Sequence, residues 1–245
     1  MPETLHSILF LVLSYQLAVG SELSTGMDEA RPAKDHQSSL LLLHLDEESE
    51  TNIKDDNSSG RPPAIVKLVG DPPPTWDEGY FTKGLHLQEG KTNGLQVAAS
   101  VIEKQNIRIG FFFKWDYIFK SDPGYLFNCP GEIFARASLV ENGAESAKIR
   151  VTFGIKKADD TYLEITSPEQ SALDDEWHYL EFVRAWDGTL LEGIIYLDGV
   201  RTISGSAQTA PLSSGKPLFF GSDGSPNSIG GVFDEIRIGP MQQAR

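Results

Sequence analysis

The sequence has a single cysteine, Cys129, among its 245 residues. No disulfide can therefore form within the chain. The folded state must instead be stabilised by an apolar core, to which 40% apolar residues can contribute, or by a metal ion. Cys129 lies between Leu126 and Pro130 in a short apolar stretch. We interpret it as a small buried hydrophobic residue rather than a reactive thiol.

Basic residues are also scarce. The chain carries 21 lysines and arginines against 35 aspartates and glutamates, which gives a formal net charge of −14 at neutral pH. Such a protein repels nucleic-acid phosphates and anionic bilayers, so we predict no nucleic-acid partner. Cations and uncharged polymers such as glycans remain as partners.

Familiar catalytic motifs are missing as well. The five histidines are scattered and form no His-Glu-x-x-His metal motif, and no Gly-x-Ser-x-Gly elbow occurs. Catalysis by residues brought together from distant parts of the chain stays open. The sequence therefore favours a binding protein over an enzyme.

The N-terminus carries the one long apolar run, Leu5 to Val19, which is too short to span a bilayer comfortably. It ends in the small residues Ala18-Val19-Gly20, which predicts a signal peptide over residues 1–20. The alternatives are an uncleaved anchor and a misassigned start. Residues 21–38 have the composition of a flexible linker, and residues 39–245 are predicted to form the folded domain. We expect a secreted, periplasmic or cell-surface protein with no transmembrane segment in the mature chain.

Beyond Leu40 no stretch keeps the 3.6-residue period of a major helix, whereas short apolar runs alternate with turn residues. Ile149 to Lys156 alternates strictly between apolar and polar residues, which is typical of a half-buried antiparallel strand. Arg108 to Trp115 alternates too, and Asp198-Gly199 predicts a tight hairpin. The pattern therefore predicts an all-β, antiparallel two-sheet sandwich.

Several motifs occur in a recognisable order. The segments of the second half are Asp175 to Phe182, Trp186 to Thr189, Ile195 to Val200, Leu218 to Ser222 and Phe233 to Ile238. Earlier segments are Leu45 to Glu47, Asp55 to Gly60 and Trp76 to Leu87. Together they resemble the laminin-G-like, concanavalin A-like jelly-roll family over residues 39–239. The resemblance implies two packed antiparallel sheets, and similar proteins include glycan-binding modules, adhesion domains and accessory domains of glycosidases.

A calcium site is predicted at the last strand. Strict alternation places Asp234 on the same face as Val232, Ile236 and Ile238. If that face is inward, the carboxylate is partly buried and needs a cation or several hydrogen bonds. The resemblance implies a calcium ion between the opening loop and the final strand. The predicted ligands are Asp56, Asn57 and Asp234, completed by backbone carbonyls. The alternative is that Asp234 accepts backbone amides and the early acidic loop is solvated.

Three other residues are predicted to contact a glycan. Trp76 follows a run of prolines and is expected to be exposed, while Asp223 and Asn227 belong to the polar loop 222–228. Trp115 and Trp177, by contrast, are predicted to lie in the core, because they fall within expected strands.

A comparison with glucanases of the same fold bears on catalysis. Such enzymes carry a Glu-x-Asp-x-Glu or Glu-x-Asp-x-x-Glu motif, which this chain lacks. We therefore predict a secreted carbohydrate- or glycoconjugate-binding module, calcium-assisted and without catalysis of its own. An adhesion or protein-interaction module is the first alternative, and a glycan-degrading enzyme is the second.

Overall fold

The computed structural model describes most of the predicted folded region. The described residues are 39–47, 53–57, 59–98, 106–116, 123–142, 147–171, 175–208, 215–222 and 225–240. All of them belong to one unit of the chain, Lys34–Arg245. The predicted signal peptide and linker, residues 1–38, lie outside the described residues. Within the described ranges the chain forms sixteen strands, and no helix long and apolar enough to cross a membrane is found there.

One eight-stranded sheet, here called the first sheet, contains both the opening and the closing strand. Its order is β14 (Val200–Gln208), β13 (Leu190–Leu197), β12 (His178–Trp186), β6 (Ile107–Trp115), β16 (Gly231–Pro240), β4 (Lys83–Leu87) and β3 (Thr75–Glu78), and β1 (Leu41–Leu43) also pairs with β16. All of these pairings are antiparallel.

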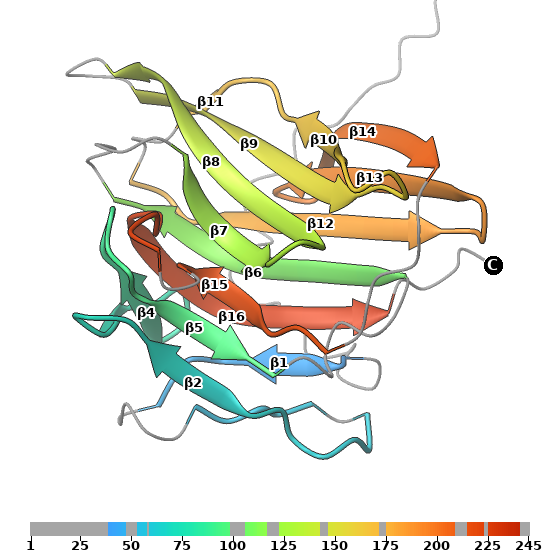
Figure 1. The fold of residues 1–245 in the computed structure, drawn as a ribbon. Coiled ribbons are helices and arrows are strands. Elements are labelled where there is room, and N and C mark those ends of the chain that lie inside the picture. The colour runs from blue at the N-terminus through green and yellow to red at the C-terminus, as the bar shows by residue number, and fades with distance from the viewer. Residues whose placement is uncertain are drawn as a thin grey trace, which may run out of the picture. The chain divides into compact units, whose positions relative to one another are not determined.

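The second sheet also has eight strands. Its order is β10 (Tyr162–Thr166), β9 (Ala147–Lys156), β8 (Ile133–Asn142), β7 (Gly124–Cys129), β15 (Leu218–Gly221), β5 (Gly94–Val97) and β2 (Val66–Val69), and β11 (Gln170–Ser171) pairs with β9. These pairings are antiparallel too. Figure 1 shows the two sheets face to face. The prediction of an all-β, two-sheet antiparallel sandwich is confirmed.

The core lies between the sheets and is rich in phenylalanine. Phe111 of the first sheet meets Phe220 of the second with ring centroids 5.9 Å apart, and Phe127 meets Phe182 at 5.1 Å. Such edge-to-face pairs stabilise a core beyond the burial of their area alone. Cys129 is also fully buried, and burial raises the pKa of its thiol to about 12. It packs as an inert apolar side chain.

The expected alternation holds along most strands but not along β16. Asp234 pairs with Phe112, whereas Arg237 pairs with Gly110, so β16 contains a bulge in which Glu235 adopts a φ of 49°. A bulge of one residue moves the following side chains to the opposite face. The prediction that Asp234 shares a face with Ile236 is therefore wrong, because Asp234 lies on the outer face of the sheet.

Trp177 corrects a second expectation. It precedes β12 and is only half-buried, and its ring meets the edge of Tyr80 at 6.0 Å. Tyr80 in turn stacks on Phe112, with ring centroids 4.0 Å apart. Because Phe112 points away from the core, Trp177 belongs to an aromatic cluster on the outer face of the first sheet. Trp115, in contrast, is buried in the core as predicted.

Candidate functional site

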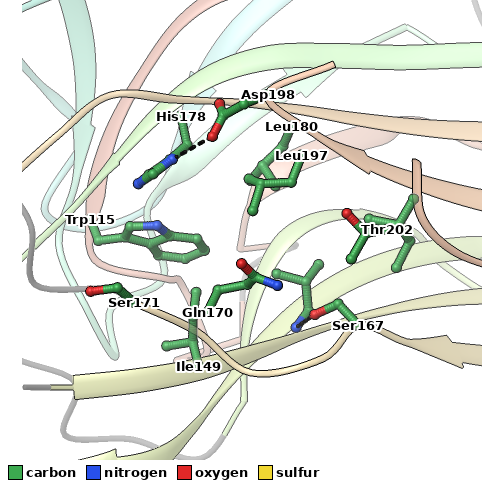
Figure 2. Close-up of a pocket in the computed structure, with 12 residues that line it drawn as sticks. Trp115, Ile149, Ser167, Gln170, Ser171, His178, Leu180, Leu197, Asp198 and Thr202 are labelled. Carbon is green, nitrogen blue, oxygen red and sulfur yellow. Dashed lines mark hydrogen bonds and ion pairs between the residues drawn. The ribbon is translucent and has the colours of Figure 1, made fainter. Parts of the chain in front are cut away.

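A pocket of about 180 Å³ opens between the two sheets, beside their β14 and β11 strands. Strands β6, β12, β13 and β14 of the first sheet line one side, and β9, β11 and the loop before β11 line the other (Figure 2). The lining residues are Trp115, Ile149, Val151, Ser167, Gln170, Ser171, His178, Leu180, Ile195, Leu197, Asp198 and Thr202. Apolar and polar groups thus line the same pocket.

Trp115 supplies the aromatic wall. It is the last residue of β6, and it is 7% exposed because its ring packs edge-on against Phe113 at 4.5 Å. The indole lies beneath His178 and beside Ser171 in the pocket (Figure 2). A rigid aromatic surface held in this way can pack against the apolar face of a small ring.

A histidine and an aspartate form the polar wall opposite β11. Nδ1 of His178, the first residue of β12, lies 2.9 Å from Oδ2 of Asp198. The other carboxylate oxygen accepts the amide hydrogen of Tyr179 at 2.8 Å. Asp198 sits in the predicted hairpin turn with a φ of 50°, and this turn orients its carboxylate toward β12.

The pKa of Asp198 follows from these contacts. Burial by itself would raise the pKa, but the hydrogen bonds from His178 and from the Tyr179 amide outweigh burial and leave it below the usual value. The carboxylate is therefore ionised at neutral pH and accepts hydrogen bonds. It is the one carboxylate that lines the pocket among the described residues.

Strand β11 contributes two polar side chains from the second sheet. Gln170 pairs with Ile149 and Ser171 pairs with Lys148. Oε1 of Gln170 and Oγ of Ser171 accept no hydrogen bond from any described residue, and the Gln170 amide nitrogen is 3.4 Å from the Pro168 carbonyl. Ser167, in contrast, is used within the protein, because its hydroxyl accepts the Val151 amide and donates to Pro168. Gln170 and Ser171 are thus the groups best able to bind a ligand.

The three residues predicted to contact a glycan lie elsewhere. Trp76 in β3 is half-buried, pairs with Leu85 and packs against the core, so it is less exposed than expected. Asn227 is half-buried, and its carbonyl accepts the Tyr125 amide at 2.9 Å. Asp223 lies outside the described residues. Neither Trp76 nor Asn227 lines the pocket.

The opening loop does not present its acidic residues as expected. Asp55, not Asp56, is the buried carboxylate, and it accepts amide hydrogens from Leu42 at 3.1 Å and Ala64 at 2.8 Å. Asp56 points to Lys54 and is partly exposed. Asn57 donates its side-chain amide to Asp55 and accepts a hydrogen bond from the Ser59 amide. This loop is thus held together by its own hydrogen bonds.

Asp234 lies in a different environment. It is fully buried, and its two carboxylate oxygens accept the amide hydrogens of Phe81 at 3.1 Å and Glu235 at 2.7 Å. Burial raises its pKa to about 7, and the negative charges of Glu235 and Asp46 add to the shift. These are the hydrogen bonds of the alternative prediction, in which Asp234 accepts backbone amide hydrogens. No hydrogen bond between described residues joins it to Asp56 or Asn57.

The acidic residue near Asp234 is Asp46, whose negative charge acts on the Asp234 carboxylate. Its carboxylate accepts the hydroxyl of Thr82, one residue after Phe81. In the described part of the chain no three histidine, cysteine, aspartate or glutamate side chains gather closely enough to hold a metal by themselves. A cation here would need backbone carbonyl oxygens in addition to the two carboxylates. Among the described residues no cationic side chain contacts the buried Asp234 carboxylate, which fits such an ion.

Comparisons with known proteins bear on the fold. No family model matches the sequence, and no curated protein matches it as a relative. The binding domain of Paraclostridial Mosquitocidal Protein 1 superposes with a TM-score of 0.61 at 12% identity, over 85% of this chain and 50% of that one. The receptor-binding domain of botulinum neurotoxin type G gives 0.56 at 12% identity, over 84% and 49%. This chain thus spans about half the length of these two toxin domains.

A third structure matches over nearly its full length. Domain 4 of AbnA, an extracellular arabinanase from Geobacillus stearothermophilus, was solved in complex with arabinotriose. It superposes with a TM-score of 0.53 at 15% identity, over 84% of this chain and 94% of that domain. At such identities the likeness concerns the fold alone. The chain has the antiparallel, two-sheet jelly-roll fold of the concanavalin A-like sandwiches.

Proposed function

We propose that this chain is a laminin-G-like carbohydrate-binding module that works outside the cytosol and binds its glycan in the pocket between β11 and β14. The observation that carries the proposal is the pocket itself. It sets the indole of Trp115 beside the polar groups of Gln170, Ser171 and the His178–Asp198 pair. Sugar rings have one apolar face and a rim of hydroxyls, so a site for them needs this combination.

Two further points support binding without catalysis. Glycosidases of the common two-carboxylate type need a pair of acids about 5 to 10 Å apart, whereas Asp198 is the one carboxylate among the described lining residues. The arabinanase domain of similar fold was solved with arabinotriose, which makes a neutral oligosaccharide a reasonable first ligand to try.

The test is calorimetric titration of the protein with arabinotriose, xylotriose and cellotriose. We expect at least one to bind, and we expect Gln170→Ala to weaken that binding by about tenfold, the effect of losing one good hydrogen bond. Gln96→Ala is the matched control, because Gln96 is a half-buried glutamine of β5 in the same sheet that does not line the pocket. If no neutral glycan binds, the proposal fails. If both variants lose affinity equally, the site is elsewhere.

We further propose that calcium assists the fold at Asp46 and Asp234. Calcium would supply the positive charge that the buried Asp234 carboxylate lacks and would allow it to stay ionised at neutral pH. Asp56 and Asn57, the other predicted ligands, already have partners within their own loop. We assign Asp46 and Asp234 to the ion because the negative charge of Asp46 acts on the buried Asp234 carboxylate.

Thermal unfolding in EDTA and in millimolar calcium tests this assignment. Calcium at about a hundred times its dissociation constant should stabilise the wild type by about 2.7 kcal/mol, which raises Tm by several degrees. Asp234→Asn should abolish the rise, and Asp56→Asn should keep it. If Asp56→Asn loses the rise as well, the opening loop takes part in the site. If the wild type does not respond, the calcium proposal is wrong while glycan binding stands on its own test.

A further inference from the structure

Both sheets contribute aliphatic side chains to the pocket. Ile149 and Val151 come from β9 of the second sheet, and Leu180, Ile195 and Leu197 come from β12 and β13 of the first. All but Leu197 are at most 2% exposed and belong to the core. A hydroxyl group placed against these side chains gives up its hydration and finds no hydrogen-bond partner in return. The part of a ligand that faces them must therefore be apolar.

Two hydroxyl groups of the lining are already used by the protein. The Ser167 hydroxyl donates to the Pro168 carbonyl at 2.8 Å, and the Thr202 hydroxyl donates to the Val200 carbonyl at 3.2 Å. Neither has a hydrogen left to donate to a ligand. An unsubstituted sugar carries a hydroxyl on most of its ring carbons, and each one that is buried needs a partner. The lining therefore suits a sugar that has an apolar substituent in place of one hydroxyl.

An acceptor and a donor face the pocket from opposite sheets. Asp198 lies in the turn between β13 and β14, and Gln170 lies in β11, across the pocket from it (Figure 2). The ionised Asp198 carboxylate can only accept hydrogen bonds, whereas the Gln170 amide can also donate. A trans secondary amide points its N–H and its C=O in opposite directions. Such a group is suited to donate to Asp198 and to accept from Gln170.

We propose that the pocket recognises a neutral N-acetylated amino sugar, whose acetamido group enters between the two sheets. The inference rests on the proposed function and names the class of sugar. The acetamido N–H donates to Asp198, its carbonyl accepts from Gln170, and its methyl group packs on aliphatic side chains such as Leu197. Trp115 packs on the apolar face of the ring. No lysine or arginine is among the described lining residues, so an acidic sugar finds no cationic partner there.

Calorimetric titration with matched sugars tests this inference. Cellotriose and triacetylchitotriose have the same linkages and differ at C2 of each ring, where the first has a hydroxyl and the second an acetamido group. Methyl galactoside and the methyl glycoside of N-acetylgalactosamine form a second pair. We expect the acetylated sugar to bind at least tenfold more tightly in at least one pair, because it buries a methyl group and gains a hydrogen bond.

The ratio of affinities within a pair ties this preference to the pocket. Gln170→Ala should reduce the ratio severalfold, because alanine cannot donate to the acetyl carbonyl. Gln96→Ala should keep the ratio, because Gln96 lies in β5 of the same sheet and does not line the pocket. A general loss of stability lowers both affinities and leaves their ratio unchanged. A ratio that Gln170→Ala does not alter would place the acetamido group elsewhere and overturn the inference.

Other results would also overturn it. Equal affinities within both pairs would mean that the acetamido group is not recognised, while glycan binding would still stand. Methyl fucoside bound more tightly than either acetylated sugar would assign the aliphatic side chains to a methyl group without an amide. Binding of arabinotriose or xylotriose alone would remove this inference and keep the proposed function. Absence of binding by every sugar would remove both.

Discussion

Two aspartates of the first sheet show how the same side chain acquires opposite properties. Asp198 and Asp234 both accept backbone amide hydrogens, from Tyr179 and from Phe81 with Glu235. Asp198 also has His178 beside it and is 36% exposed, and its pKa is lowered. Asp234 is fully buried near Asp46, and its pKa is raised to about 7. The hydrogen bond with His178 thus favours the ionised form of Asp198, whereas no cationic side chain among the described residues does so for Asp234.

The largest expected effect concerns the pH dependence of stability at Asp234. Its native pKa of about 7 exceeds the ordinary aspartate value of 3.8, so between these pH values the native state binds more protons than the unfolded state. The contribution of Asp234 to the free energy of unfolding therefore falls as pH rises from about 4 to 7, by an amount on the order of 4 kcal/mol. Urea unfolding in EDTA at a series of pH values measures this slope.

The neutral variant Asp234→Asn isolates that contribution. It should lack the slope, so the wild type should lose stability relative to the variant as pH rises to 7. Calcium should reduce the difference, because a bound cation favours the ionised carboxylate. Parallel pH profiles for the two proteins would show that burial does not perturb Asp234 and would remove the contrast with Asp198.

Asp198→Asn should act in the opposite direction. Because the native pKa of Asp198 is lowered, its contribution to stability is present above the unfolded value near 4 and disappears as pH falls through the native value. We expect the variant to lose about 1 kcal/mol at pH 7, where a charge-assisted hydrogen bond becomes a neutral one, and nothing in strong acid. It should also weaken binding of the neutral glycan.

Asp187 provides the control for that variant. It lies in the turn between β12 and β13, accepts the Thr189 and Leu190 amides, and has a lowered pKa for that reason, but it does not line the pocket. Asp187→Asn should lower stability at neutral pH and leave glycan affinity unchanged. Loss of affinity in both variants would mean that general stability, and not the pocket, governs binding.

The smallest effect is expected for the turn aspartate Asp160, for which replacement by glycine is compared with the same change at Asp198. Asp160 and Asp198 have φ values of 61° and 50°, a region where glycine is less strained. Asp160→Gly removes only a surface ion pair with Lys156 and should change stability by no more than about 1 kcal/mol. Asp198→Gly should destabilise, because it removes the bonds to His178 and Tyr179. Equal responses in urea unfolding would mean that Asp198 is needed only for its backbone conformation.

The strands were predictable because their pattern is local. Alternation from Ile149 to Ile155 reports which face meets the core, and Asp198-Gly199 reports the tight turn, whatever lies elsewhere in the chain. The bulge at Glu235 was not predictable in this way, since its extra residue is visible only in the pairing of β16 with β6. One shifted residue then moved Asp234 to the other face.

The acidic partner of Asp234 shows the same limit. Sequence reasoning selected Asp56 and Asn57 because the resemblance implied an opening loop beside the last strand. In the structure β1 pairs with β16, and it is Asp46, a few residues beyond β1, that lies near Asp234. The order of motifs does not determine which of several neighbouring carboxylates points inward. The local backbone conformation determines that.

The sequence by itself determined that this protein is an acidic, all-β sandwich without a disulfide, because composition and two-residue periodicity depend on neighbouring residues alone. Only the tertiary structure decided where a ligand can bind. Trp115, Gln170 and His178 come from three strands in two sheets, and no spacing along the chain predicts their meeting. The packing of the sheets creates the pocket, and burial together with neighbouring charge gives Asp198 and Asp234 their different pKa values.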